Sequence, residues 1–394
     1  MEYVRFQHLA EDHQFSPRYG ALVVNRSGKW HWVELGPAGE VAAALDGLDE
    51  LLRARLTPTD ADFTSAARRV ERELWEPLRR LLEPETAEVV IAPDAKINLL
   101  SFAILWQDGA FLGEPLRFRY VTSGRRLVAP PHAGPHSKLG VIVAAPDFDG
   151  SVLQESVIDP LRKLGGRALE WLGMRGSKCL PESYPLLPGT MKEGEQLEHI
   201  WSQKGLSEVR LLRASAAKKD AVLAVQRPRL LHIATHGQYV EGDAFPPNPM
   251  LRCWLALAGA DRTLARLRSG TFVEVGDDGI LRADEIRSMD LHQTQLVALS
   301  ACDSGIGAIR SGEGIFGLRR AFHEAGVRNL FLTLWPVQDS RTAEFVPEFY
   351  RHLLGGADPV DALHVVQASR LEEFRATAGP AAAARLFGPF VISA

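Results

Sequence analysis

Residues 229–237 read RLLHIATHG, and residues 295–305 read QLVALSACDSG. Each stretch begins with a short apolar run and ends in polar or reactive side chains. Short apolar runs that alternate with helical segments are typical of a mostly parallel sheet covered on both faces. The sequence therefore predicts an α/β fold, with its chemistry at the carboxyl ends of the strands.

The apolar pattern continues on both sides of these two stretches. The further predicted strands in this part of the chain are LGVIVAA (139–145), VRLLRA (209–214) and VRNLFLTLW (327–335). Residues 129–137 hold three prolines and a glycine, which neither a helix nor a central strand accommodates. We therefore predict a smaller, non-catalytic α/β region at 1–135, followed by a catalytic domain at 136–394.

Two helix starts have sequence signals. Thr190 and Glu193 have the spacing of a capping box, in which each side chain bonds the backbone N–H of the other residue. Asp358 and Pro359 supply an N-cap and a first-turn proline for a later helix. Both pairs predict that a helix begins at or next to them.

The composition excludes several classes of protein. Hydrophobic residues make up 46% of the 394 residues and charged residues 24%, the balance of a globular chain rather than a disordered one. The formal net charge of −4 offers no basic field to nucleic acid. No apolar run reaches the roughly 18 residues that span a bilayer, and residues 1–16 lack the apolar core of a secretory signal. We therefore expect a cytoplasmic protein without a membrane or nucleic-acid partner.

The chain has three cysteines, Cys179, Cys253 and Cys302, and none of them has CxxC spacing. Such a sparse, odd-numbered set predicts neither a disulfide framework nor a zinc site. No other metal-ligand spacing is present, so we expect no metal and no cofactor. Cys179 and Cys253 have no histidine at a matching strand end, and we expect both to be structural.

His236 and Cys302 each follow a predicted strand of the same sheet. An imidazole that can take the thiol proton converts a cysteine into a nucleophilic thiolate. The N–H of Gly237, with that of Cys302, is the expected donor pair for the oxyanion. His232 lies inside its strand, and we expect it to have a structural role. No third catalytic residue is identifiable, so the sequence predicts a dyad.

Six blocks carry a resemblance to a known family: LHIATHG, GILRADEI, LVALSACDSGIG, GEGIFGLRRAFHEAGV, LFLTLWPVQD and FYRHLLGG. Their order resembles that of CHAT domains, which are caspase-like peptidases often attached to TPR repeats. The resemblance covers about residues 65–394. It implies a caspase-like three-layer sandwich with a mostly parallel central sheet. It also implies that the histidine of HxxxHG and the cysteine of SAC, here His236 and Cys302, are the catalytic pair.

Three residues near the same strand ends are candidates for substrate binding. Asp303 directly follows the predicted nucleophile, and Trp335 ends the neighbouring strand, where it is a candidate wall of a side-chain subsite. Asp339 is either an acidic specificity group or the cap of the next helix. The resemblance further implies a protein substrate, such as a pore-forming effector, in bacterial antiviral defence.

Two other readings compete with the peptidase. The glycines after Cys302 suggest a nucleotide loop, but the frame that starts at Gly305 has Arg310 in place of its third glycine, and no GK[ST] follows. The stronger alternative is a catalytically silent caspase-like interaction module.

Residues 238–279 and 304–314 are candidate gates beside the site, so we also expect an activating protein partner.

Overall fold

The computed structural model of the chain describes residues 1–9, 14–128, 137–150, 180–204, 206–239, 249–269, 278–300, 313–337 and 339–394. The chain forms two compact units, Met1–Pro131 with Gly356–Ala394, and His132–Gly355. Compactness does not say which unit is catalytic, so the functional division at residue 135 stays a prediction.

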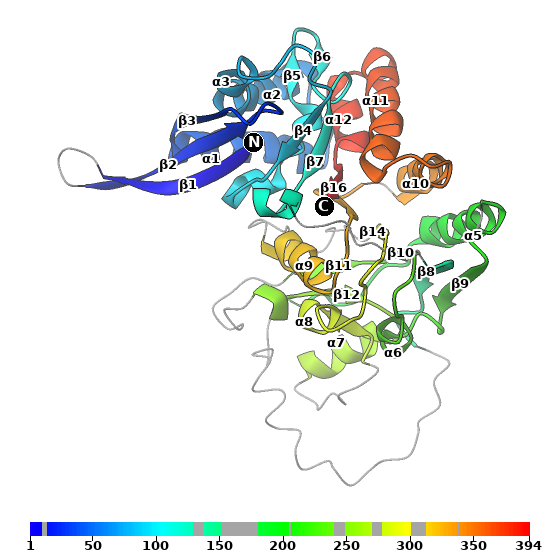
Figure 1. Cartoon of the computed structure of the whole chain (residues 1–394). Coiled ribbons are helices and arrows are strands. Elements are labelled where there is room, and N and C mark those ends of the chain that lie inside the picture. Colours follow the sequence, from blue (N-terminus) through cyan, green and yellow to red (C-terminus); the bar gives the residue numbers. More distant parts are fainter. Residues whose placement is uncertain are drawn as a thin grey trace. The chain divides into compact units, whose positions relative to one another are not determined.

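The second unit contains a parallel sheet with the strand order β15-β14-β10-β8-β9. These strands are β8 (Leu139–Pro146), β9 (Glu208–Ala214), β10 (Leu230–Ala234), β14 (Leu296–Leu299) and β15 (Leu330–Thr333). Figure 1 labels β14, β10, β8 and β9. All four neighbouring pairs are parallel, and β10 and β14 are buried along their whole length. The predicted α/β class with a mostly parallel sheet is confirmed.

Helices and a smaller antiparallel sheet accompany these strands. The helices are α5 (Pro188–Gln203), α6 (Lys219–Leu223), α7 (Ala260–Arg268), α8 (Ala283–Ile286), α9 (Glu313–Glu324) and α10 (Asp339–Leu354). The smaller sheet has the order β11-β12-β13, formed by β11 (Gly237–Tyr239), β12 (Cys253–Ala256) and β13 (Ile280–Arg282). Helices α5 and α10 pack against each other, and α5 also covers β8 and β9. The small sheet starts at Gly237, so it continues the chain directly from the predicted catalytic histidine.

The first unit is an α/β body of its own. It contains an antiparallel sheet, a short hairpin and a parallel sheet with the order β4-β7-β16. The elements are β1 (Glu2–Leu9), β2 (Phe15–Val24), β3 (Trp30–Pro37), α1 (Ala38–Arg53), α2 (Asp60–Leu74), α3 (Glu76–Arg79), β4 (Glu88–Ile91), β5 (Trp106–Gln107), β6 (Ala110–Phe111), β7 (Arg117–Tyr120), α11 (Pro359–Thr377), α12 (Pro380–Phe387) and β16 (Phe390–Ser393). Within the described part of the chain, no helix is long and apolar enough to cross a membrane.

One predicted helix start is confirmed and the other is wrong. Asp358 caps α11, where its carboxylate accepts the Val360 N–H at 2.9 Å. Helix α5 begins earlier than the capping box predicts, at Pro188, and Leu187 occupies the N-cap without a side-chain bond. Glu193 is instead fully buried inside the protein, away from the helix start.

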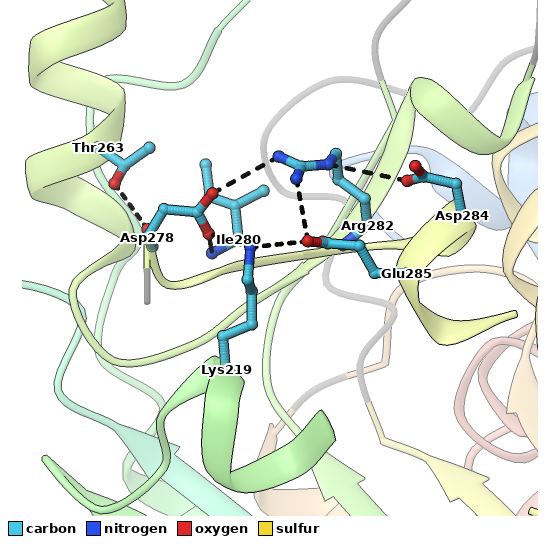
Figure 2. A network of polar contacts seen from close by, with 7 residues as sticks. All are labelled: Lys219, Thr263, Asp278, Ile280, Arg282, Asp284 and Glu285. Carbon is cyan, nitrogen blue, oxygen red and sulfur yellow. Dashed lines mark hydrogen bonds and ion pairs between the residues drawn. The ribbon is translucent and has the colours of Figure 1, made fainter. Parts of the chain in front are cut away.

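A buried cluster of charges fixes β13 to its neighbours (Figure 2). The Lys219 ammonium, whose side chain is 3% exposed, lies 2.8 Å from carboxylate oxygens of both Asp278 and Glu285. Asp278 also accepts the Ile280 N–H at 2.9 Å, and its backbone carbonyl accepts the Thr263 hydroxyl at 2.6 Å. Because α6, α7, α8 and β13 all contribute, the cluster fixes the start of β13 in the small sheet.

Lys219→Met tests this lock. The substitution removes the closest cation from the buried Asp278 carboxylate and leaves it only Arg282, at 3.5 Å. Loss of one partner of a buried ion pair costs about 3–5 kcal/mol. We expect urea unfolding to show a loss of that size. The control is Arg210→Met, which removes an ion pair with Glu208 whose two side chains are 59% and 53% exposed. A surface pair contributes about 0–1 kcal/mol, so equal losses in the two variants would contradict a stabilising role for the cluster.

Candidate active site

The two strands that precede the predicted dyad are direct neighbours in fixed register. Strands β10 and β14 are parallel, with Ile233 opposite Leu299, and the Ser300 N–H donates to the Ile233 carbonyl at 2.9 Å. His236 comes three residues after Ile233, and Cys302 comes three residues after Leu299. Cys302 itself lies outside the described residues. Because β10 and β14 are paired neighbours in this register, their described ends lie side by side at the carboxyl edge of the sheet.

The imidazole of His236 is held by a backbone carbonyl. Its Nε2 lies 2.7 Å from the Pro185 carbonyl oxygen, and the side chain is almost fully buried. A carbonyl only accepts, so Nε2 carries the proton, and in the neutral ring Nδ1 is then the proton acceptor. The sequence analysis missed Pro185, because a backbone acceptor can come from any residue type and leaves no signal in the sequence.

Two aromatic rings flank the same imidazole. Tyr184 stacks on His236 with ring centroids 5.4 Å apart and planes at 25°, and Phe148 lies at the same centroid distance. The Tyr184 hydroxyl accepts the Trp254 indole N–H at 2.9 Å, and the Tyr184 N–H donates to Asp261 at 2.9 Å. Burial raises the pKa of Tyr184, so its hydroxyl stays neutral. These contacts fix both the position and the tilt of the imidazole ring.

Gly237 is the first residue of β11, opposite Leu255 on β12. The Ala256 N–H donates to the His236 carbonyl at 2.9 Å, which makes Gly237 and Leu255 a non-hydrogen-bonded pair of this ladder. In such a pair the N–H groups point away from the partner strand. Strand β11 is also an edge strand, so the Gly237 N–H is directed away from the small sheet, as an oxyanion donor requires.

The other predicted site residues have different outcomes. Trp335 follows β15 and is 2% exposed. Ala298 on β14 pairs with Phe331 on β15. Trp335 comes four residues after Phe331, and Cys302 comes four residues after Ala298. Helix α10 begins at Asp339, but that side chain, like the whole of Asp303, lies outside what the structure describes. The substrate-binding roles of all three residues stay predictions.

Of the two cysteines expected to be structural, only Cys253 is described. It lies in β12 with no exposed surface. Burial, with a smaller contribution from Asp284, raises the pKa of its thiol well above the ordinary value. Cys179 lies outside the described residues. Among the residues that the structure covers, no group of three or more histidine, cysteine, aspartate or glutamate side chains could hold a metal ion.

Comparison with known families assigns this architecture. The model of the CHAT domain family matches residues 64–381. The chain belongs to the CHAT domain family. The family match supports a protein of the caspase-like protease kind. The match agrees with the α/β fold and with the resemblance found in the sequence.

The CHAT chain is also similar to individual proteins. It is 24% identical over 307 residues to tetratricopeptide repeat protein 28 of Mus musculus. The aligned region covers 72% of this chain but only 11% of that protein. Among solved structures it is similar to the Arg-specific cysteine proteinase gingipain R (RgpB), with a TM-score of 0.39 and 7% identity, over 90% of this chain and 74% of the other. A complex of Porphyromonas gingivalis RgpB pro- and mature domains gives a TM-score of 0.38 and 8% identity, over 91% and 76%. Because both TM-scores are low, the assignment rests on the family match.

Thiol alkylation separates the three cysteines of this CHAT domain. We expect a haloacetamide at neutral pH to label Cys302 first, because the sequence predicts a base at a matching strand end for Cys302 and for neither of the other cysteines. Cys253 should stay unlabelled in the folded protein, since burial keeps its thiol protonated and out of reach. Peptide mapping by mass spectrometry over a time course measures the order, and labelling in urea provides the control in which all three react. Faster labelling of Cys253 or Cys179 than of Cys302 would count against the proposed nucleophile.

Proposed function

We propose that this CHAT domain is a cysteine endopeptidase in which Cys302 is the nucleophile and His236 is its base. One observation carries the proposal: the register of β10 and β14, which sends the chain from Ile233 and from Leu299 to His236 and Cys302 over equal numbers of residues. A fixed imidazole at one strand end and a thiol at the next provide the pair that thiolate chemistry needs.

The proposed reaction follows from the hydrogen bonds of His236. With Nε2–H bound to the Pro185 carbonyl, Nδ1 accepts the Cys302 thiol proton. The thiolate attacks the peptide carbonyl carbon, and the N–H groups of Gly237 and Cys302 bind the resulting oxyanion. The imidazolium then returns the proton to the leaving amine, the C–N bond breaks, and water hydrolyses the thioester with the imidazole again as base.

The substrate proposed for this site is a folded or extended protein segment rather than a small molecule. Asp303, Trp335 and Asp339 remain the candidate subsite residues around the cleaved bond, because each is close in sequence to the end of β14 or β15. A specific partner protein, such as a pore-forming effector in bacterial defence, is the proposed target. The chain spans only 11% of tetratricopeptide repeat protein 28, so nothing about the substrate is taken from that protein.

The burial of His236 favours an activated enzyme over a permanently open one. The side chain is 1% exposed, so a peptide reaches the imidazole only after part of its cover moves. We therefore propose that a partner protein or a cleavage event rearranges the segments next to the site. The same burial is the observation that favours the second candidate, a catalytically silent caspase-like interaction module.

Alanine substitutions at the dyad decide between the two candidates. Cys302→Ala and His236→Ala should each abolish peptide-bond cleavage. The two residues act as one catalytic unit, so the loss of either one costs about as much rate as the loss of both. The matched controls are Cys253→Ala, which removes the buried thiol of β12, and His199→Ala, which removes an exposed imidazole of α5. Both controls should cleave at the wild-type rate. Activity above about a tenth of wild type in either dyad variant, with normal thermal unfolding, would refute the assignment.

Profiling of new N-termini identifies the substrate in the same experiment. A cell extract is incubated with the wild-type chain or with Cys302→Ala, and new peptide N-termini are compared by mass spectrometry. The proposal predicts a small set of cleavages that appears only with the wild type, and that grows when the activating partner is present. Identical N-termini from both chains, with and without added neighbouring gene products, would favour the silent module.

A further inference from the structure

The protein buries a carboxyl–imidazole pair that the proposed reaction does not use. Glu193 on α5 and His232 on β10 are both completely inaccessible to solvent, and the glutamate Oε1 lies 2.8 Å from the imidazole Nε2. His232 stands in the middle of β10, four residues before His236. Removing two ionisable groups from water costs several kcal/mol for each charged group, so the pair needs a physical reason.

The carboxylate of Glu193 contacts both strands that precede the dyad. Oε1 meets His232 of β10, and Oε2 accepts the Ser300 hydroxyl at 3.4 Å. Ser300 directly follows β14, two residues before Cys302, and its N–H bonds the Ile233 carbonyl at 2.9 Å. One side chain on a helix therefore links the strand of the base to the end of the strand of the nucleophile.

The surrounding packing holds the carboxylate in this position. Helix α5 approaches the sheet closely at Gly194, where a Cβ would lie only 2.8 Å from the Ala144 Cβ. On the other side of the pair, the Tyr350 hydroxyl lies 3.3 Å from the His232 Nδ1, and their rings meet edge to face at 5.7 Å. Burial and the nearby Glu193 raise the pKa of Tyr350, so its hydroxyl stays neutral. The polar atoms of both side chains thus each lie 2.8 to 3.4 Å from another polar atom.

Stability alone does not explain this arrangement. Apolar side chains of similar volume often hold a helix on a sheet as well as a buried ion pair does, or better. An apolar contact has no preferred direction, so it holds the position of one strand along its neighbour less precisely than a polar contact does. We propose that Glu193 is a positioning residue: through His232 and Ser300 it sets the relative height of the strand ends that carry His236 and Cys302. This inference rests on the proposed peptidase function.

Glu193→Gln tests the inference with the shape of the side chain retained. A displacement near 1 Å at the reacting groups costs about 100-fold in rate, so we expect kcat to fall about 10- to 100-fold while KM changes little. The matched control is Glu195→Gln, the same substitution on the same helix at a residue whose side chain is 56% exposed. Equal kcat values in the two variants would overturn the proposal. A loss of activity that only follows the unfolded fraction at the assay temperature would also overturn it.

A second readout works without catalysis. Hydrogen–deuterium exchange of the Ser300 amide reports the bond to the Ile233 carbonyl, and we expect faster exchange in Glu193→Gln than in Glu195→Gln. The double variant Glu193→Gln/His232→Gln, in which two amides can bond each other, should slow the exchange again and recover part of kcat. Unchanged Ser300 exchange in Glu193→Gln would refute the positioning role. A wild-type chain that cleaves nothing would refute the peptidase proposal and leave the exchange result standing.

Discussion

The hydrogen bond from the Ser300 N–H to the Ile233 carbonyl sets the register on which the proposed chemistry depends. It closes the β10–β14 ladder one residue beyond the last paired residues, Ile233 and Leu299. A shift of one residue would turn every later side chain to the opposite face of the sheet. Such a shift is costly because it would move the buried His232 away from Glu193. The proposed dyad therefore depends on the packing of the sheet more than on the loops after the strands.

Separate sets of contacts keep the histidine side of the site in place. The small sheet receives the chain at Gly237, and Ala256 of β12 bonds the His236 carbonyl. Strand β12 is in turn paired with β13, which the Lys219 cluster fixes at its base (Figure 2). On the ring itself, Tyr184 and the Pro185 carbonyl determine the tilt and the tautomer. Pre-organisation of this kind costs no reorganisation when the thiol proton moves.

Sequence reasoning succeeded where one local pattern determines one structure. The apolar runs before His236 and Cys302 are buried parallel strands, because such runs without polar alternation fit only a sheet covered on both faces. It failed at Glu193, whose capping-box spacing is a local signal that a buried histidine far along the chain overrides. The Pro185 carbonyl and the packing of residues 356–394 with the first unit had no local signal at all, since both depend on tertiary contacts.

A crystal structure of the chain after alkylation with iodoacetamide tests the central claim most directly. The claim is that the ends of β10 and β14 deliver a base and a nucleophile to one point. It predicts a carbamidomethyl group on the Cys302 Sγ, with that sulfur facing the His236 Nδ1 on the same side of the sheet, about 3–4 Å away. A Cys302 side chain on the opposite face from His236, or an adduct on Cys179 or Cys253 with Cys302 unmodified, would contradict it.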